Sequence, residues 1–260
     1  MAFSEDCQLL LTLTAAPDYV VMCWNWSKAK LIAHLKLEAT LPFYRCSFSP
    51  IDASVACTIG RDCVQFYRIA EKDMRILHTN NEATTGLSNH NFVSQCWLRH
   101  PEDTLVAGTD TGELVAFQNG EYKCHLPLLK REMDEKVTSL LAFSLGFIVG
   151  GNSGTFHFIY HKPEAMHAPL AEQFSLVHTI SSDLTTESII SMSLAFEEDG
   201  FSALSADNQL LYISLLNPIT VAQDDIVLAQ NMSFHGPKSI KGMDICLKKP
   251  LIITCSEDST

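Results

Sequence analysis

Short apolar runs separated by tight turns recur along this sequence, and they constrain its fold more than any other feature. The stretch from residue 92 to 120 shows the unit once, as three apolar runs that end at Trp97, Ala107 and Phe117. A glycine-bounded turn at residues 108–112 joins the second run to the third. Because strands of this length joined by tight turns pair with their neighbours, the unit predicts a small antiparallel sheet.

The turns repeat at a regular interval. Aligning the second turn of each unit places six residues in register: Asp18, Arg61, Thr111, Ser153, Asp207 and Asp258. They lie 43, 50, 42, 54 and 51 residues apart. A period of about 40–45 residues, stretched by loop insertions, is the spacing of four-stranded propeller blades. No stretch keeps a sustained helical periodicity, which weakens any α/β alternative.

We therefore predict an all-β protein with the fold of an incomplete β-propeller. The units amount to about four full blades and two partial ones. A single propeller segment is expected over residues 1–260, truncated at both ends, with insertions or loops near residues 80–91, 126–136 and 161–173. Loops held apart by rigid blades are the expected contact surfaces of such a fold.

The composition agrees with a packed globular body. The chain has 260 residues, of which 47% are hydrophobic and 18% are charged, and this argues against disorder. Polar residues interrupt every apolar run before it reaches the eighteen or so residues that span a bilayer. The N-terminus places acidic residues before its first apolar run, so no secretory signal is expected.

The cysteines are expected to be reduced residues of the core. There are nine, an odd number, no two have C-x-x-C spacing, and most lie within apolar runs. This pattern favours a cytosolic protein without a disulfide framework or a zinc site.

The net charge of −12 restricts the class of partner. A field of this sign repels nucleic-acid phosphates and anionic membrane surfaces. We therefore expect protein partners with neutral or basic surfaces, with no binding of nucleic acid or membranes and no small-molecule substrate.

Two patterns suggest chemistry but have simpler explanations. Asp110-Thr111-Gly112 spells the motif of aspartic proteases, which need two carboxylates that share a proton. The comparable Asp258 lacks the following glycine, so the motif is interpreted as a hairpin turn. His157 and His161 suggest a metal site, but on a strand these positions lie roughly 13 Å apart. We therefore predict no catalytic residue, no cofactor and no metal.

The last unit resembles a WD repeat. In that family a loop histidine, a strand Ser or Thr and a turn aspartate form a hydrogen-bonded network with a tryptophan one strand later. His235, Thr254 and Asp258 match the first three roles, and Asp18 and Trp24 match the last two in the first unit. Other units hold the tryptophan position with Tyr67, Phe117, Ile159 and Ile213. The resemblance implies a WD40-like propeller whose degenerate blades rely on apolar packing between blades.

The order of distinctive segments is also similar to that of an axonemal family of WD-repeat proteins from cilia and flagella. The similarity spans nearly the whole chain and rests on residues 1–4, 23–28, 47–50, 108–114 and 249–252. Family members are longer, with a second propeller and a coiled-coil tail, so the chain is expected to correspond to part of a family N-terminal half.

This resemblance implies a non-catalytic scaffold of motile cilia or flagella. Members of the family place inner dynein arms and neighbouring regulatory complexes on the axoneme, which implies axonemal protein partners and a cytoskeletal location in the cilium or flagellum. The alternative is a general cytosolic WD-repeat adaptor that assembles protein complexes outside cilia.

Overall fold

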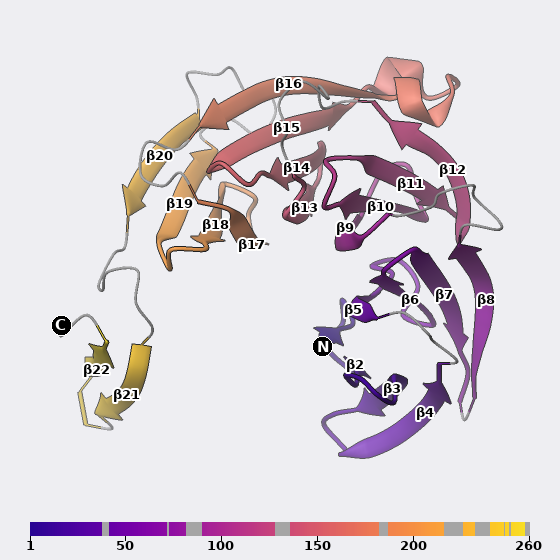
Figure 1. The fold of residues 1–260 in the computed structure, drawn as a ribbon, viewed down its shortest axis with the longest axis horizontal. Coiled ribbons are helices and arrows are strands. Elements are labelled where there is room, and N and C mark those ends of the chain that lie inside the picture. The colour runs from indigo at the N-terminus through magenta and orange to yellow at the C-terminus, as the bar shows by residue number, and fades with distance from the viewer. Residues whose placement is uncertain are drawn as a thin grey trace.

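The structure is an open arc of antiparallel sheets. The computed structural model describes residues 1–37, 42–71, 73–81, 90–127, 136–181, 187–215, 226–231, 240–246, 248–249 and 251–257. Five sheets have four strands each, in sequential order, and we call them blades 1 to 5. A two-stranded sheet follows, which we call the C-terminal hairpin. Figure 1 shows the blades side by side, with blade 1 and the C-terminal hairpin at opposite ends of an unclosed arc.

The strands have the following bounds. Blade 1 contains β1 (Ala2–Phe3), β2 (Leu9–Leu13), β3 (Val20–Asn25) and β4 (Lys30–Lys36). Blade 2 contains β5 (Phe43–Phe48), β6 (Val55–Gly60), β7 (Cys63–Ile69) and β8 (Met74–Asn81). Blade 3 contains β9 (Phe92–Trp97), β10 (Thr104–Thr109), β11 (Leu114–Gln118) and β12 (Glu121–Leu126).

The remaining elements continue the same pattern. Blade 4 contains β13 (Ser139–Phe143), β14 (Gly146–Gly150), β15 (Thr155–His161) and β16 (Phe174–Ser181), with the 3-10 helices η2 (Pro163–Ala165) and η3 (Leu170–Glu172) before its last strand. Blade 5 contains β17 (Ile189–Leu194), β18 (Gly200–Ser205), β19 (Leu210–Leu215) and β20 (Ile226–Asn231). The C-terminal hairpin contains β21 (Ile240–Cys246) and β22 (Leu251–Ser256).

The prediction of an all-β, incomplete propeller is confirmed, with one difference in the number of blades. The first unit was expected to be partial, but Ala2 pairs with Leu11 and Phe3 with Leu10, which makes blade 1 four-stranded. A two-residue strand carries too little periodicity to be detected in the sequence. The structure therefore has five four-stranded blades rather than about four.

Each blade has the same irregularity in its outer strand pair. The register between the third and fourth strands shifts at one place in every blade, and the third-strand residue just after the shift is Trp24, Tyr67, Phe117, Ile159 or Ile213. A β-bulge bends a strand and increases its local twist. The five residues that the sequence aligned with the WD tryptophan therefore share one structural position.

The core lies between blades and not within them. Four apolar clusters each join two adjacent sheets, from blades 1 and 2 through to blades 4 and 5. Alternate residues of one strand serve two clusters: Leu105 and Ala107 face blade 2, whereas Val106 belongs to the cluster shared with blade 4. Two-sided burial explains why the second and third strands are continuous apolar runs.

Glycine allows the blades to approach closely at two equivalent positions. A Cβ atom at Gly108 of β10 would lie 2.2 Å from Val137 Cγ1, just before the first strand of blade 4. A Cβ at Gly150 of β14 would lie 3.0 Å from Ile189 Cβ, on the first strand of blade 5. The absence of a side chain at these positions lets the next blade pack directly on the backbone.

A matched pair of phenylalanines in blade 5 tests the interblade core. Phe201 is fully buried against blade 4, while Phe196 is fully exposed in the turn before it. We expect Phe201→Ala to lower the free energy of unfolding by about 3–5 kcal/mol. Phe196→Ala should change it by less than about 0.5 kcal/mol. Urea unfolding monitored by circular dichroism measures both, and equal losses would contradict the interblade core.

The cysteines allow a second test, because all nine are free thiols and differ in burial. Cys7, Cys246 and Cys255 are exposed, whereas desolvation raises the pKa of Cys23 to about 11 and that of Cys57 to about 12. A thiol pKa raised from about 9 to about 11 lowers the reactive thiolate fraction at pH 8 roughly 100-fold. Peptide mapping after brief iodoacetamide treatment should therefore find the three exposed cysteines labelled and Cys23 and Cys57 unlabelled. Rapid labelling of Cys57 in the native chain would contradict this burial.

Candidate interaction site

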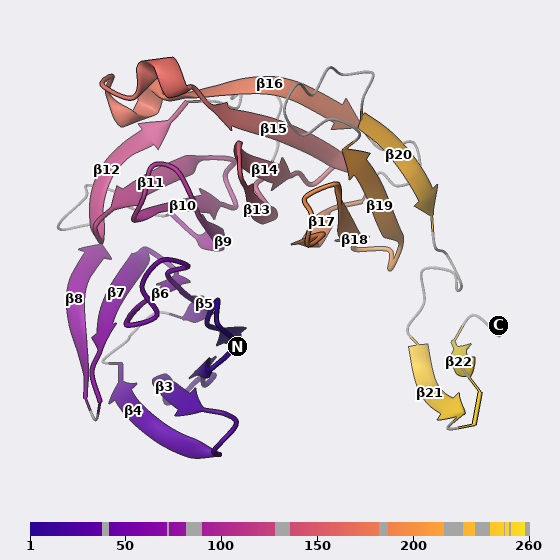
Figure 2. The same cartoon turned by 180° about the vertical axis from the view of Figure 1, so that it is seen from behind.

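The clearest candidate for a binding surface is the connection between β15 and β16. This connection, residues 162–173, forms η2 and η3 at the rim of the arc, beside β12 of blade 3 (Figures 1 and 2). This segment corresponds to the contact loop expected near residues 161–173, and the structure shows two 3-10 turns within it. Of the other expected loops, residues 82–89 and 128–135 lie outside the described residues.

Hydrogen bonds hold this connection in one shape. The Lys162 backbone N–H donates to the Gln173 carbonyl at 2.7 Å, which closes the loop at its base. The buried Gln173 side chain donates from Nε2 to the carbonyl of Ala168 at 2.8 Å and to that of Met166 at 3.3 Å. Because the buried Gln173 amide satisfies two carbonyls of the loop, the connection is held as an ordered structural element.

A cavity of about 1090 Å³ lies between this connection and blade 3, and we call it the rim groove. Its walls come from the first turn of blade 3, the strands β11 and β12, the first turn of blade 4, and the end of β15 with the connection that follows it. The lining includes Pro101, Cys124, Leu145, Met166 and Leu170. Apolar walls with a few polar groups are typical of binding clefts.

Three basic side chains and one carboxylate are among the polar groups of the rim groove. His100, Lys123 and His161 line it, with Glu102 as the only carboxylate among its lining residues. Lys123 Nζ lies 3.3 Å from Glu121 Oε2 on the same strand. His161 packs its ring edge-on against Phe174, with centroids 5.6 Å apart, and its buried Nε2 has no hydrogen-bond partner among the described residues.

Trp24 occupies the expected WD position in blade 1, but Asp18 does not join it. Trp24 Nε1 donates a hydrogen bond to Thr12 Oγ1 at 3.0 Å, which links the third strand to the second. Asp18 instead pairs with Lys36 Nζ at 2.5 Å, and both side chains are largely exposed. The full four-residue network is therefore reduced to one hydrogen bond in this blade.

Blade 2 keeps the same link with a tyrosine. Tyr67 Oη lies 2.7 Å from Thr58 Oγ1 and donates to Gln65 Oε1 at 2.9 Å. Desolvation raises the pKa of the Tyr67 hydroxyl well above its ordinary value, which fits its role as a neutral hydrogen-bonding group. Phe117, Ile159 and Ile213 hold the position in blades 3 to 5 with apolar side chains, all buried.

The predicted network of the last unit is only partly within the structure. Thr254 lies on β22, in register with Met243 of β21. His235 and Asp258 lie outside the described residues. The assignment of His235, Thr254 and Asp258 to a WD network therefore stays a prediction.

Asp110, Thr111 and His157, which were considered for catalysis or metal binding, have hydrogen-bond partners. Asp110 accepts a hydrogen bond from Asn91 Nδ2 at 2.9 Å, and Thr111 bonds the neighbouring Thr109 side chain within the turn. His157 is buried, with Nδ1 3.0 Å from Thr179 Oγ1 of the next strand. The described part of the chain contains no group of three or more His, Cys, Asp or Glu side chains placed to hold a metal ion. None of the described helices is long and apolar enough to cross a membrane.

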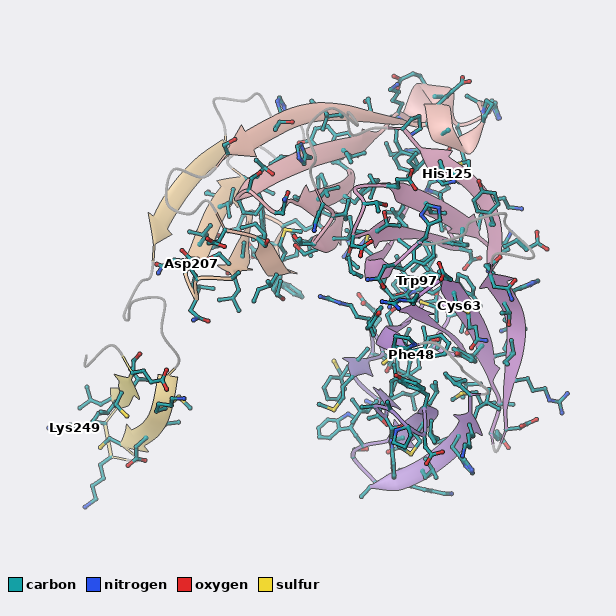
Figure 3. The ribbon with its side chains drawn as sticks, viewed as in Figure 1. Phe48, Cys63, Trp97, His125, Asp207 and Lys249 are labelled. Carbon is teal, nitrogen blue, oxygen red and sulfur yellow. The ribbon has the colours of Figure 1, made fainter. Side chains whose placement is uncertain are left out.

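Polar contacts also connect neighbouring blades, which the sequence did not indicate. Trp97 Nε1 of blade 3, labelled in Figure 3, donates to Ser47 Oγ of blade 2 at 2.9 Å. Asn80 of β8 donates to the Gly120 carbonyl at 2.7 Å and accepts from the Tyr122 N–H at 3.1 Å, both in blade 3. These hydrogen bonds fix the spacing of blades 2 and 3.

Glu198 extends this coupling over three blades. It lies in the β17–β18 turn of blade 5, and its Oε2 accepts a hydrogen bond from the Ser144 N–H of blade 4 at 2.9 Å. Arg99 of blade 3 places Nη1 2.9 Å from Oε1, an ionic contact without the alignment of a hydrogen bond. The Glu198 side chain is only 12% exposed. In the sequence it looks like an ordinary turn residue, because its partners come from other blades.

Comparison with known proteins supports this fold and the family resemblance. No protein-family model matches the chain. The chain is 24% identical to cilia- and flagella-associated protein 57 of Mus musculus over 99% of its own length, and 25% identical to cilia- and flagella-associated protein 57 A of Tetrahymena thermophila over 96%. A second Tetrahymena relative, protein 57 C, is 24% identical over 99%. The chain spans only 20–24% of these relatives.

The arrangement of the sheets matches a solved propeller. The crystal structure of the Cps50 (Swd1) β-propeller domain of Myceliophteria thermophila superposes with a TM-score of 0.69, covering 99% of this chain and 80% of that one. The sequence identity is 14%, so the match concerns the fold alone. The predicted propeller fold and the resemblance to cilia- and flagella-associated proteins are confirmed.

The tyrosine link of blade 2 provides a test of the reduced network. Tyr67→Phe removes the hydroxyl that hydrogen-bonds Thr58, and it leaves the buried Thr58 Oγ1 with one hydrogen-bond partner fewer. We expect a loss of about 1–3 kcal/mol in the free energy of unfolding. The double substitution Thr58→Val and Tyr67→Phe should recover part of that loss, because both polar groups are then removed. Chemical denaturation of the four proteins of this cycle measures the coupling, and strictly additive losses would show that the two side chains do not interact.

Proposed function

We propose that this chain is a non-catalytic WD-repeat scaffold of motile cilia and flagella. The observation that carries the proposal is its similarity, over 96–99% of its length, to three proteins named for their association with cilia and flagella. Because the chain spans at most 24% of each relative, the functions of the whole relatives are assigned to it only as a proposal.

The architecture supports a role in holding proteins rather than in chemistry. Interblade apolar clusters and polar bridges make the arc rigid, and the rim groove is a preformed surface on it. Asp110, the residue most suggestive of catalysis, is engaged with Asn91 in a turn. Propellers bind other proteins through loops that a rigid scaffold presents.

The finer part of the proposal concerns the place of action. We propose an axonemal location in the cytoskeleton of the cilium or flagellum, and partners among the inner dynein arms and their neighbouring regulatory complexes. The acidic net charge supports protein partners and disfavours nucleic acid and anionic membranes. No cofactor, metal or small-molecule substrate is part of this function.

The alternative is a general cytosolic adaptor with the same fold. A WD40-like propeller supports that role equally well, because fold alone does not determine function. Only the relatives' names favour the ciliary role. Expression confined to cells with motile cilia would favour the scaffold, and broad expression in cells without them would favour the adaptor.

Genetic removal in a ciliated cell tests the proposal. Deleting the gene should leave axonemes with fewer inner dynein arm heavy chains, measured by quantitative mass spectrometry of isolated axonemes, and should slow ciliary beating. Outer dynein arm chains serve as the internal control and should stay unchanged. Re-expression of the tagged protein should restore the inner arms and place the tag along the axoneme. Normal inner arms in the deletion strain, with the tag confined to the cell body, would refute the axonemal role.

A further inference from the structure

The rim groove is an enlarged version of a cavity that recurs between blades. The equivalent cavity between blades 2 and 3 has a volume of about 350 Å³ and is lined by turns and outer-strand residues such as Ile51 and Leu77. The rim groove, between blades 3 and 4, has about 1090 Å³. The added walls come from the connection with η2 and η3, because seven residues of the connection line the groove, together with the preceding His161. The insertion therefore creates a space that ordinary blade packing does not need.

The groove is preformed, and its position prevents a partner strand from adding to blade 3. The hydrogen bonds of Gln173 fix the connection before any partner arrives, so binding does not have to order a loop. η3 lies against β12 and covers part of the outer edge of blade 3. A partner strand therefore cannot extend blade 3 at that place, and recognition must come from side chains entering the groove.

The walls favour an apolar side chain. Leu145, Leu170 and three prolines form much of the lining, and Met166 is 64% exposed at the rim. A flexible, polarizable methionine at the edge of an apolar cleft adapts to side chains of different shapes. Apolar surface of this kind gains most from contact with another apolar group.

The polar groups favour a carboxylate beside that side chain. The whole chain has 30 acidic and 18 Lys or Arg residues, yet His100, Lys123 and His161 line the groove with Glu102 as their only acidic neighbour in the lining. Further acids stand close to the lining residues in sequence: Asp103, Glu121, which contacts Lys123, and the exposed Glu164 and Glu172 of the connection. His161 Nε2, which no described group satisfies, can donate a hydrogen bond to a carboxylate.

We propose that the rim groove binds an extended segment of a partner protein in which an apolar residue stands next to an acidic one. The apolar side chain enters between Leu145 and Leu170, and the carboxylate meets Lys123 and His161. This inference rests on the proposed function in taking the partner to be a protein. The acidic residue that it predicts in the partner differs from the neutral or basic surface that the net charge of the chain indicates.

Selection from a random peptide library tests the proposal without a known partner. The folded 260-residue chain is immobilised, decapeptides displayed on phage are selected, and the best clones are synthesised with a fluorescent label. We expect enrichment of peptides with Asp or Glu beside Leu, Ile, Phe or Met. Fluorescence anisotropy gives the affinities, and hydrogen exchange should show protection at residues 121–126 and 162–173 on binding.

Matched variants separate the groove from the rest of the surface. Met166→Asp places a charge in the apolar rim, and Met243→Asp makes the same change at a similarly exposed methionine, 67% exposed, on the C-terminal hairpin. Lys123→Glu reverses a groove charge, and Lys36→Glu reverses a charge on β4. Each groove variant should weaken the selected peptides at least 10-fold, and neither control should change their affinity more than 2-fold.

The outcomes separate this inference from the proposed function. A basic or neutral consensus would overturn the predicted chemistry. Failure to select any binder, or selected peptides that bind all four variants equally, would overturn the groove as a docking site. Neither result depends on cilia, since it is obtained with the purified chain. If the axonemal test fails but the groove variants weaken peptide binding as expected, the protein is a peptide-binding adaptor that does not act on the axoneme.

Discussion

Burial of apolar surface between neighbouring sheets is the interaction on which the rest of this structure depends. A single four-stranded sheet has two faces and cannot bury either alone. Here both faces of blades 2, 3 and 4 pack against neighbours, so one strand such as β10 supplies residues to two separate clusters. The turns remain at the surface, where they are free to differ from blade to blade.

This dependence explains how the blades tolerate the loss of the WD network. Trp24 and Tyr67 each keep one side-chain hydrogen bond to a threonine of the neighbouring strand, while Phe117 fills the same bulged position with an apolar ring. The position itself is preserved because the bulge shapes the outer strand. Polar contacts that WD repeats make within a blade are partly replaced here by contacts between blades, such as Trp97 with Ser47.

The sequence predicted the features that are local and repeated. Turn residues every 42–54 positions gave the number and order of the units, and their alignment identified Trp24, Tyr67 and Phe117 as equivalent. Features built from distant segments could not be found this way. Ala2–Phe3 is too short to show a period, and the rim groove exists only because residues near 101, 124 and 170 meet in space.

Glu198 changes how such an arc is expected to come apart. In a simple row of repeats each unit touches only its neighbours, and stability is approximately a sum of unit and interface terms. The carboxylate of Glu198 contacts the blade beside it through Ser144 and the blade beyond that through Arg99. Unfolding of blade 5 therefore removes the carboxylate that pairs with Arg99 of blade 3, even while blade 4 is still folded. A nearest-neighbour description of this protein lacks that term, because the ion pair of Arg99 and Glu198 couples blades 3 and 5 directly.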